Sequence, residues 1–515
     1  MLRTWLIRLF WALAALLLAA AGWAGWNFRD RFPEYEVRLR VEAPAPRTVR
    51  VGFARYSITP PVEDTWTDRD GNAAYDPKAD GPYEDRNGNG RFDAFWMAGF
   101  GQARAAAGIH DSLWARAIVI DDGQTRIALV SIDAIGFGHD EVIRVRKLIP
   151  ADAEIDYAML TSTHVHEAPD LMGLWGPGSF RSGVNPAYMA MVQQRAAQAV
   201  AAAAGRLRPA RLRFAQDLSG AAPLVGDTRD PQVLDPGIYL MQAVDQEADT
   251  TLGTLMVWGN HPETLWADNL LITSDFPHYF REGVERGVHR GDSLLAPGIG
   301  GICVYVNGAI GGLMTTHPEI GVPDLWSDTV YTAPSFDKAR AQGERLALLA
   351  LGALGQAETV EQAGIGLRAR TLDLPLDNSL FRLAAAMGTL QRGMSTWMHV
   401  RSEVAVWTLG PASFLLVPGE IYPEIVNGGI VAPETGDFQG APVEVPALRE
   451  RMPGTYRFVL GLANDEVGYI IPRTEWDTQA PFLGGASEGP YGEIVSLGPE
   501  TAPILHRALL ELLEP

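Results

Sequence analysis

Five short stretches, far apart in the chain, each end a strand-like apolar run, and together they offer the ligands of a metal ion. They are residues 163–166, 260–262, 418–420 and 464–469, and a glycine-rich turn after residues 304–306. Two or more histidines, one carboxylate and an open position make a catalytic zinc site. Because the ligands of one ion must meet, the pattern requires a fold that gathers these strand ends, and it predicts a metal-dependent hydrolase.

Strand-like and helix-like segments alternate along most of the chain. The clearest strand-like runs are apolar or β-branched and cover residues 115–120, 126–132, 157–160, 252–258, 302–306, 404–409, 413–417 and 456–462. The helix-like segments are 139–148, 186–204, 276–287, 336–354 and 503–513. The alternation predicts an α/β fold with mixed sheets and flanking helices, in which loops at the carboxyl ends of strands hold the chemistry.

Charge and cysteine content exclude two classes of protein. The formal net charge of the 515-residue chain is −20. A nucleic-acid partner requires a basic footprint, so we expect none. The one cysteine, Cys303, excludes an intrachain disulfide, and its apolar neighbours predict a buried thiol.

The first 28 residues predict a membrane anchor. Arg3 and Arg8 precede an unbroken apolar run over residues 9–26, which is just long enough to cross a bilayer as one transmembrane helix. The arginines favour an orientation with the N-terminus inside. A cleaved signal peptide is the alternative, because small residues occur near positions 19–25. In both cases we expect a linker over residues 29–48 and an extracytoplasmic catalytic domain over residues 49–515, which cleavage would release as a secreted protein.

An acidic insertion at residues 63–95 contains two loops that share one register. Their oxygen donors follow the spacing of calcium-binding loops and are Asp68, Asp70, Asn72 and Asp76 in the first and Asp85, Asn87, Asn89 and Asp93 in the second. The pattern resembles EF-hand and dockerin loops, except that Ala79 and Trp96 replace the last glutamate, so Asp80 or Glu84 would have to supply a carboxylate. We expect bound calcium with a structural role; a solvated, turn-rich insertion is the alternative.

Two histidines lie at the first of the strand ends. His164 and His166 are two residues apart, so in an extended chain their imidazoles point to the same side. Each of them, like His261, could equally be a structural histidine with satisfied hydrogen bonds. Glu420 and Tyr469 at other strand ends favour a shared metal site.

Several motifs in this order resemble the catalytic domain of the neutral/alkaline (non-lysosomal) ceramidase family. The matching stretches are residues 51–60, 97–101, 108–117, 161–166, 260–264, 418–420 and 468–470. The resemblance covers nearly everything from about Val49 onward. It implies a zinc ion held by His164, His261, Glu420 and Tyr469, with His166 acting beside the metal in catalysis.

The resemblance also implies an activity, namely zinc-dependent hydrolysis of amide bonds in N-acyl, ceramide-like lipids. Zinc generates a hydroxide near neutral pH and polarises the carbonyl, His166 relays a proton, and Tyr469 ligates the metal or donates to the oxyanion. Two alternatives remain: hydrolysis of esters or other amides, and a catalytically inactive, metal-stabilised binding protein.

Three further residues are candidates for the surroundings of the metal. Asp133 and Asp275 are expected to orient the histidines by accepting hydrogen bonds from them, with helix N-caps as the alternative. His110 is expected to line the same pocket, or else to be a structural histidine.

The sequence departs from the family at its serine segment. In the corresponding run, residues 307–315, Gly312 replaces an aspartate and Met314 stands at the serine. Thr315 or Thr316 could offer a displaced hydroxyl. We also expect no counterpart of the C-terminal immunoglobulin-like domain of longer ceramidases.

Overall fold

The structure is a computed structural model, and it describes residues 2–229, 232–312, 314–390, 392–433, 435–483 and 486–514. Leu313, inside the run that corresponds to the family's serine segment, therefore lies outside the described residues, as do Met1 and Pro515 at the ends of the predicted anchor and catalytic domain.

The larger of two main sheets has nine strands in the order β13-β9-β8-β7-β2-β4-β5-β6, with β16 on β7. They are β2 (Val49–Ser57), β4 (Trp114–Asp121), β5 (Arg126–Ile132), β6 (Tyr157–Ser162), β7 (Arg208–Asp217), β8 (Ile238–Asp245), β9 (Thr251–Trp258), β13 (Ile302–Asn307) and β16 (Glu358–Val360). The pairs β5–β6 and β13–β9 are parallel and the remaining pairs are antiparallel. The predicted mixed α/β fold is confirmed.

The second sheet has five strands in the order β1-β17-β18-β19-β21. They are β1 (Arg38–Val41), β17 (Ile365–Pro375), β18 (His399–Leu409), β19 (Ala412–Leu416) and β21 (Tyr456–Leu460). β1 belongs to the segment that we expected to be a linker. It pairs antiparallel with β17 at the edge of the sheet. This part of the segment is therefore integrated in the fold.

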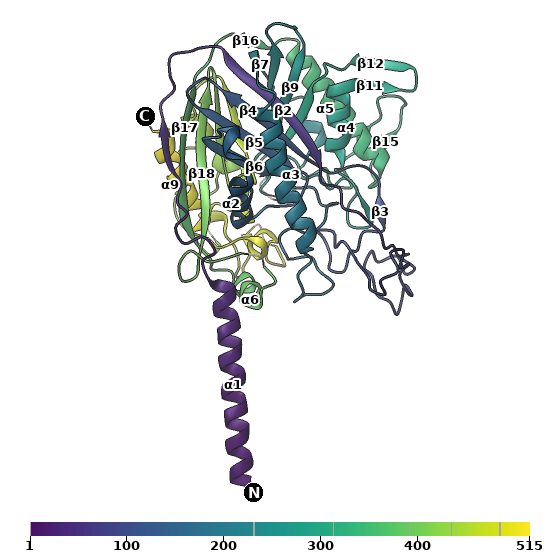
Figure 1. Cartoon of the computed structure of the whole chain (residues 1–515), viewed down its shortest axis with the longest axis vertical. Helices are drawn as coiled ribbons and strands as arrows, with labels where there is room; N and C mark the ends of the chain where they lie inside the picture. The colour runs from purple at the N-terminus through teal and green to yellow at the C-terminus, as the bar shows by residue number, and fades with distance from the viewer. Residues whose placement is uncertain are drawn as a thin grey trace.

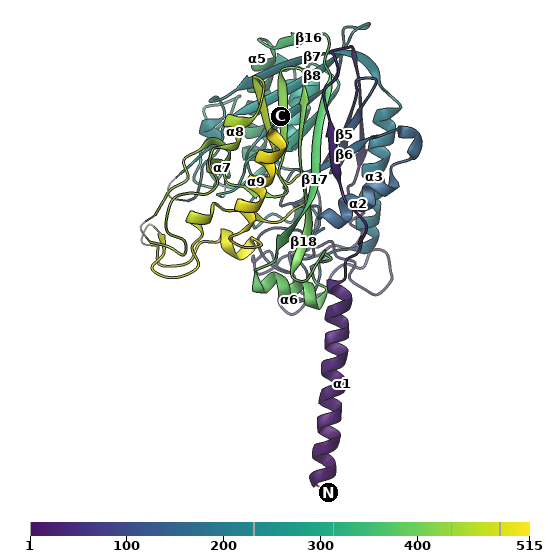
Figure 2. The same cartoon turned by 90° about the vertical axis from the view of Figure 1, so that its left-hand side faces the viewer.

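The two sheets face each other, and helices cover their outer faces. Aromatic and aliphatic side chains from both sheets form the core between them, with Trp407 and Phe414 stacked 3.6 Å apart. The helices are α2 (His139–Leu148), α3 (Pro186–Ala204), α4 (Phe276–Arg286) and α5 (Phe336–Leu354) on the larger sheet and α9 (Thr501–Leu513) on the smaller one. Figure 2 shows α3 and α9 on opposite sides of the sheets. This four-layer arrangement buries both sheets and leaves their strand ends for the site.

The N-terminal helix, α1 (Leu2–Phe28), projects from the lower end of the body, next to α6 (Ser379–Met387) (Figure 1). It is the one helix, among those the structure describes, that is long and apolar enough to cross a membrane. The remaining elements are short: β3 (Gly108–Ile109), β10 (Leu271–Ile272), β11 (Gly287–Arg290), β12 (Ser293–Pro297), β14 (Val322–Pro323), β15 (Val330–Tyr331), β20 (Glu420–Ile421), β22 (Tyr469–Ile470), α7 (Pro423–Asn427) and α8 (Leu448–Arg451).

Candidate metal centre

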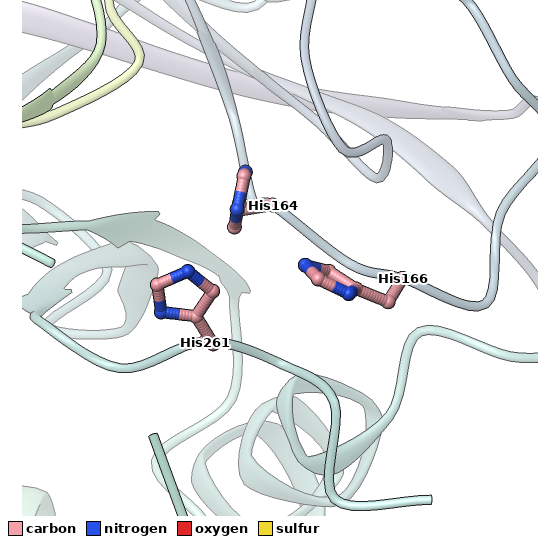
Figure 3. Close-up of side chains that lie close together, drawn as sticks. All are labelled: His164, His166 and His261. Atoms are coloured by element: carbon pink, nitrogen blue, oxygen red, sulfur yellow. The ribbon is translucent and has the colours of Figure 1, made fainter. Parts of the chain in front are cut away.

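Two histidines from different strands of the larger sheet point toward each other (Figure 3). His164 follows the end of β6 and His261 the end of β9, and their rings lie 4.7 Å apart. Each Nδ1 is 2.6–2.8 Å from a backbone carbonyl, that of Ile135 for His164 and that of Met314 for His261. Since a carbonyl only accepts, both Nδ1 atoms carry the proton. Both Nε2 atoms are therefore left with a lone pair, as metal ligation requires.

A carboxylate and a phenol come from a separate two-stranded element. β20 and β22 pair in parallel, and Glu420 is the direct partner of Tyr469. Both side chains are buried. Residues 49 positions apart in sequence thus lie side by side at the place where the histidines converge.

The distances among these four side chains fit one ion, and a water molecule would be its fifth ligand. Glu420 Oε2 is 3.1 Å from His261 Nε2 and 3.6 Å from His164 Nε2, and the Tyr469 hydroxyl is 3.4 Å from His261 Nε2. Zinc bonds of about 2.0–2.1 Å imply a separation of roughly 3.3 Å between tetrahedral ligands. The donor set and its spacing therefore suit zinc, although the metal itself remains a prediction.

The protonation states agree with a cation at this position. Burial lowers the pKa of His164 to about 4, which keeps its imidazole neutral. Burial alone would raise the pKa of Glu420, but His164, His261 and Tyr469 hold it below its usual range. For His261 burial acts downward, yet the hydrogen bond to Glu420, the charges of Glu263 and Glu420, and the Met314 carbonyl together outweigh it and raise the pKa. Glu420 thus favours a second proton on His261, at Nε2, and a metal ion would displace that proton to bind the neutral imidazole.

His166 lies beside these four side chains but forms no hydrogen bond with them. Its ring is 5.1 Å from that of His164, and its Nδ1 is 3.2 Å from Glu263 Oε2. Among the described residues neither of its ring nitrogens makes a hydrogen bond. Burial lowers its pKa well below the usual range, so the imidazole is neutral. Gly99 approaches so closely that a Cβ there would sit 2.4 Å from Nδ1, which explains the glycine.

A cavity of about 350 Å³ opens onto the candidate metal ligands. This volume is within the usual range of ligand pockets. One part of its wall is polar and includes the three histidines, Glu263, Glu420 and Tyr469. The other part is apolar and includes Ile135, Met172, Leu174, Trp175, Phe381, Leu390, Val495 and Leu497. The cavity can therefore hold a molecule with a polar reacting group and an apolar tail.

Three candidate residues neither orient the histidines nor line the cavity as expected. Asp133 accepts two hydrogen bonds from Arg281, at 2.9 and 3.0 Å, rather than orienting a histidine. Asp275 is the N-cap of α4, which was the alternative. His110 is exposed, stacks on Phe336 and bonds to Tyr279, away from the cavity. The backbone carbonyls already occupy both Nδ1 atoms, so no carboxylate is needed there.

Residues that we did not single out also line the cavity. Glu263 is two positions after His261, and the shared face of residues two apart could have indicated it. Glu466 is buried, and its Oε2 has no hydrogen-bond partner among the described residues. Of the two candidate hydroxyls, Thr315 lines the cavity, whereas Thr316 bonds to Asn260 and to Leu224.

The first acidic loop gathers carboxylates, as a calcium site would require. Oxygens of Asp68, Asp70 and Asp80 lie within 4.8 Å of one another, so Asp80 is placed to supply the missing carboxylate. In the second loop, Asp85 accepts the backbone N–H groups of Gly88 and Gly90, and Asn87 donates to Asp93. Exposed acidic groups adopt such turns without an ion, so calcium stays a prediction.

Calcium binding to this insertion is expected to raise the melting temperature. A ligand that binds the folded state only, at 100 times its Kd, adds about 2.7 kcal/mol to the free energy of unfolding. Thermal unfolding at zero and millimolar calcium measures the shift, which Asp68→Asn combined with Asp70→Asn should remove and Asp328→Asn, in an exposed loop, should keep. An unchanged melting temperature in the unmutated protein would mean that the insertion is a solvated loop.

Comparison with solved structures identifies the fold. Neutral ceramidase from Pseudomonas aeruginosa matches with a TM-score of 0.61 and 16% sequence identity, over 90% of this chain and 74% of that chain. A ceramidase complexed with C2 matches with the same score and identity, over 90% of this chain and 75% of its own. The sequence matches no protein-family model, and no curated protein matches it either. The chain therefore has a neutral-ceramidase-like fold, which confirms the predicted resemblance.

Proposed function

We propose that this protein is a zinc-dependent hydrolase of amide bonds in N-acyl lipids. The observation that supports this most is the spacing of 3.1–3.6 Å among His164, His261, Glu420 and Tyr469 at the polar end of the cavity. When bound there, zinc would lower the pKa of a water ligand to about 7 and polarise a carbonyl oxygen. The structurally similar enzymes are ceramidases. On that basis we propose ceramide-like lipids as the substrates of this chain.

The chain's own residues supply the proton transfers. His166 is neutral and free of hydrogen bonds among the described residues, so one ring nitrogen can take a proton and deliver it to the leaving amine. The charge of the Glu263 carboxylate, 3.2 Å from His166 Nδ1 but outside hydrogen-bond geometry, would favour a proton on that atom. Burial raises the pKa of Tyr469 well above its usual range, so its hydroxyl stays protonated in the metal-free protein and is suited to donate to a developing oxyanion.

The apolar wall of the cavity selects the substrate class. Its aliphatic and aromatic side chains offer few polar partners to a hydrophilic acyl group. A long acyl chain loses water on entering such a wall, and each buried CH₂ contributes about 0.8 kcal/mol. We therefore expect N-acyl lipids to be better substrates than short amides.

A screen over N-acyl sphingoid bases, N-acyl amino acids and simple esters tests this proposal. We expect kcat/KM to rise with acyl length for amides, because of the apolar wall. Faster hydrolysis of esters would favour the alternative bond. Bound zinc without turnover of any substrate would favour an inactive, metal-stabilised binding protein. Arg3 and Arg8, near the N-terminal end of α1, favour an N-terminus inside, so we propose that the catalytic domain lies outside the cytoplasm, tethered by α1.

A further inference from the structure

α6 presents apolar side chains on two sides, one packed and one exposed. On the packed side Phe381 lines the cavity and Ala385 is buried in the core. On the other side Leu380, Leu383 and Met387 are 58%, 46% and 38% exposed. Their spacing of three and four residues puts them on one helix face. An exposed apolar face of this kind marks an interaction surface.

The helix α6 lies where α1 leaves the body, as both views show (Figures 1 and 2). The Trp23 indole N–H of α1 donates to the carbonyl of Met387, at 3.1 Å. Trp397, 76% exposed, packs edge-on against Phe28 at the end of α1, with ring centroids 6.5 Å apart. The exposed apolar residues of the body therefore sit next to the last turns of the helix that can cross a membrane.

The junction between α1 and the body is held by several contacts, so the body has one orientation relative to the helix. The Asn27 side chain donates to the carbonyl of Ala386, at 3.0 Å. Directly after the helix, Asp30 forms a two-pronged ion pair with Arg401, at 2.7 and 3.0 Å. These contacts fix which face of the body a membrane crossed by α1 would meet.

The tryptophans of α1 indicate the depth of α6. Trp5 and Trp26 are 21 residues apart, or about 31 Å at 1.5 Å per residue. The hydrocarbon core of a bilayer is about 30 Å thick, and tryptophans concentrate at its two boundaries. Trp23 and Trp26 thus mark the outer boundary. Because α6 bonds to Trp23, it lies at the same level.

We propose that Leu380, Leu383, Met387 and Trp397, the interfacial patch, insert into the bilayer that α1 crosses. The occupant is lipid rather than a soluble partner, since the patch is continuous with a membrane-spanning helix and lies at the boundary level. The net charge of −20 disfavours attraction to anionic headgroups. Burial of apolar side chains therefore supplies the binding, and zwitterionic lipid suffices.

The interfacial patch also suggests a route by which a lipid substrate reaches the cavity. This route rests on the proposed function. Phe381 forms part of the cavity wall, and its neighbours Leu380 and Leu383 point to the other side of the same helix. One helix would then separate the cavity from lipid. A lipid amide could pass along α6 into the cavity without crossing water.

A dye attached to the patch tests the insertion. Cys303 is buried, so a cysteine added at the surface can be labelled alone. The full chain carrying Leu383→Cys, labelled with an environment-sensitive fluorophore, is reconstituted in phosphatidylcholine vesicles. We expect blue-shifted emission that lipids spin-labelled near the headgroup quench. The control is Leu294→Cys, 59% exposed on β12 at the opposite end of the body, which should report water.

Two outcomes would overturn the proposal. One is emission typical of water at position 383, with no quenching by the spin-labelled lipid. The other is a dye shielded from both water and lipid, together with concentration-dependent cross-linking through Leu383→Cys, which would make a second copy of the chain the occupant.

Leu383→Asp tests the consequence for substrate entry. We expect about tenfold slower hydrolysis of an N-acyl lipid embedded in vesicles, with an unchanged rate on a soluble short-chain amide. Leu294→Asp should change neither rate. Equal loss on both substrates would contradict membrane entry. If no amide is hydrolysed at all, the proposed function fails, whereas the fluorescence experiment still decides the insertion.

Discussion

Replacing His261 by alanine is expected to abolish zinc binding and hydrolysis together. The change removes one of the two proposed Nε2 ligands and leaves Glu420 buried without one of its hydrogen-bond partners. Loss of a residue that only orients a ligand costs 10–100-fold in metal affinity, so loss of a ligand should cost more than about 100-fold. Metal analysis of the purified protein and its rate on an N-acyl lipid measure the two effects.

The matched control is His289→Ala, which alters an exposed histidine on β11 and should leave both quantities unchanged. Glu420→Gln offers an independent check, because the amide keeps the volume but loses the negative charge. If Glu420→Gln retains full zinc and full activity, the four-residue ligand set is wrong.

Replacing His166 by glutamine should separate catalysis from metal binding. His166 is outside the set of mutually bonded side chains, so zinc content should remain at the level of the unmutated protein. General acid–base catalysis by one group contributes about 100- to 10,000-fold, and kcat should fall by that factor. Metal analysis and steady-state kinetics on the same preparation measure both. A loss of zinc would instead make His166 a ligand, as its place in the group of three neighbouring histidines also permits.

His110→Gln is the control for this change, since His110 is exposed and outside the cavity. Glu263→Gln should lower kcat less than His166→Gln, because Glu263 acts through the imidazole and does not itself transfer the proton. An equal loss in both variants would mean that Glu263 has a direct part in the chemistry.

Most of the strands predicted from the sequence are buried on both faces, although β8, buried along its whole length, was not predicted. β5, β6, β9 and β13 read as continuous apolar runs because they lie between a layer of helices and the second sheet. β17 was not recognised, since Arg368 and Arg370 alternate with Leu367 and Ala369 along it. The arginines face outward, where they pair with Glu42 and Glu511, so only half of the strand carries the apolar signal.

The site was predictable as far as short motifs define it. His164, His261, Glu420 and Tyr469 follow recognisable strand ends, and the structure brings all four together. The cavity could not be foreseen, because Phe381, Leu390 and Leu497 come from segments with no motif and meet the histidines only in three dimensions. The acceptors of the two Nδ1 protons could not be predicted either. They are main-chain carbonyls, which every residue has, so no residue type in the sequence indicates them.

Those main-chain acceptors have a consequence for how the protein can diverge. Every amino acid has a carbonyl, so substitutions at Ile135 or Met314 need not disturb how the imidazoles are aimed. Ile135 also belongs to the cavity wall. Mutation can therefore reshape the cavity at this position while the imidazoles keep their orientation, which separates the evolution of the cavity's shape from the preservation of the histidine pair.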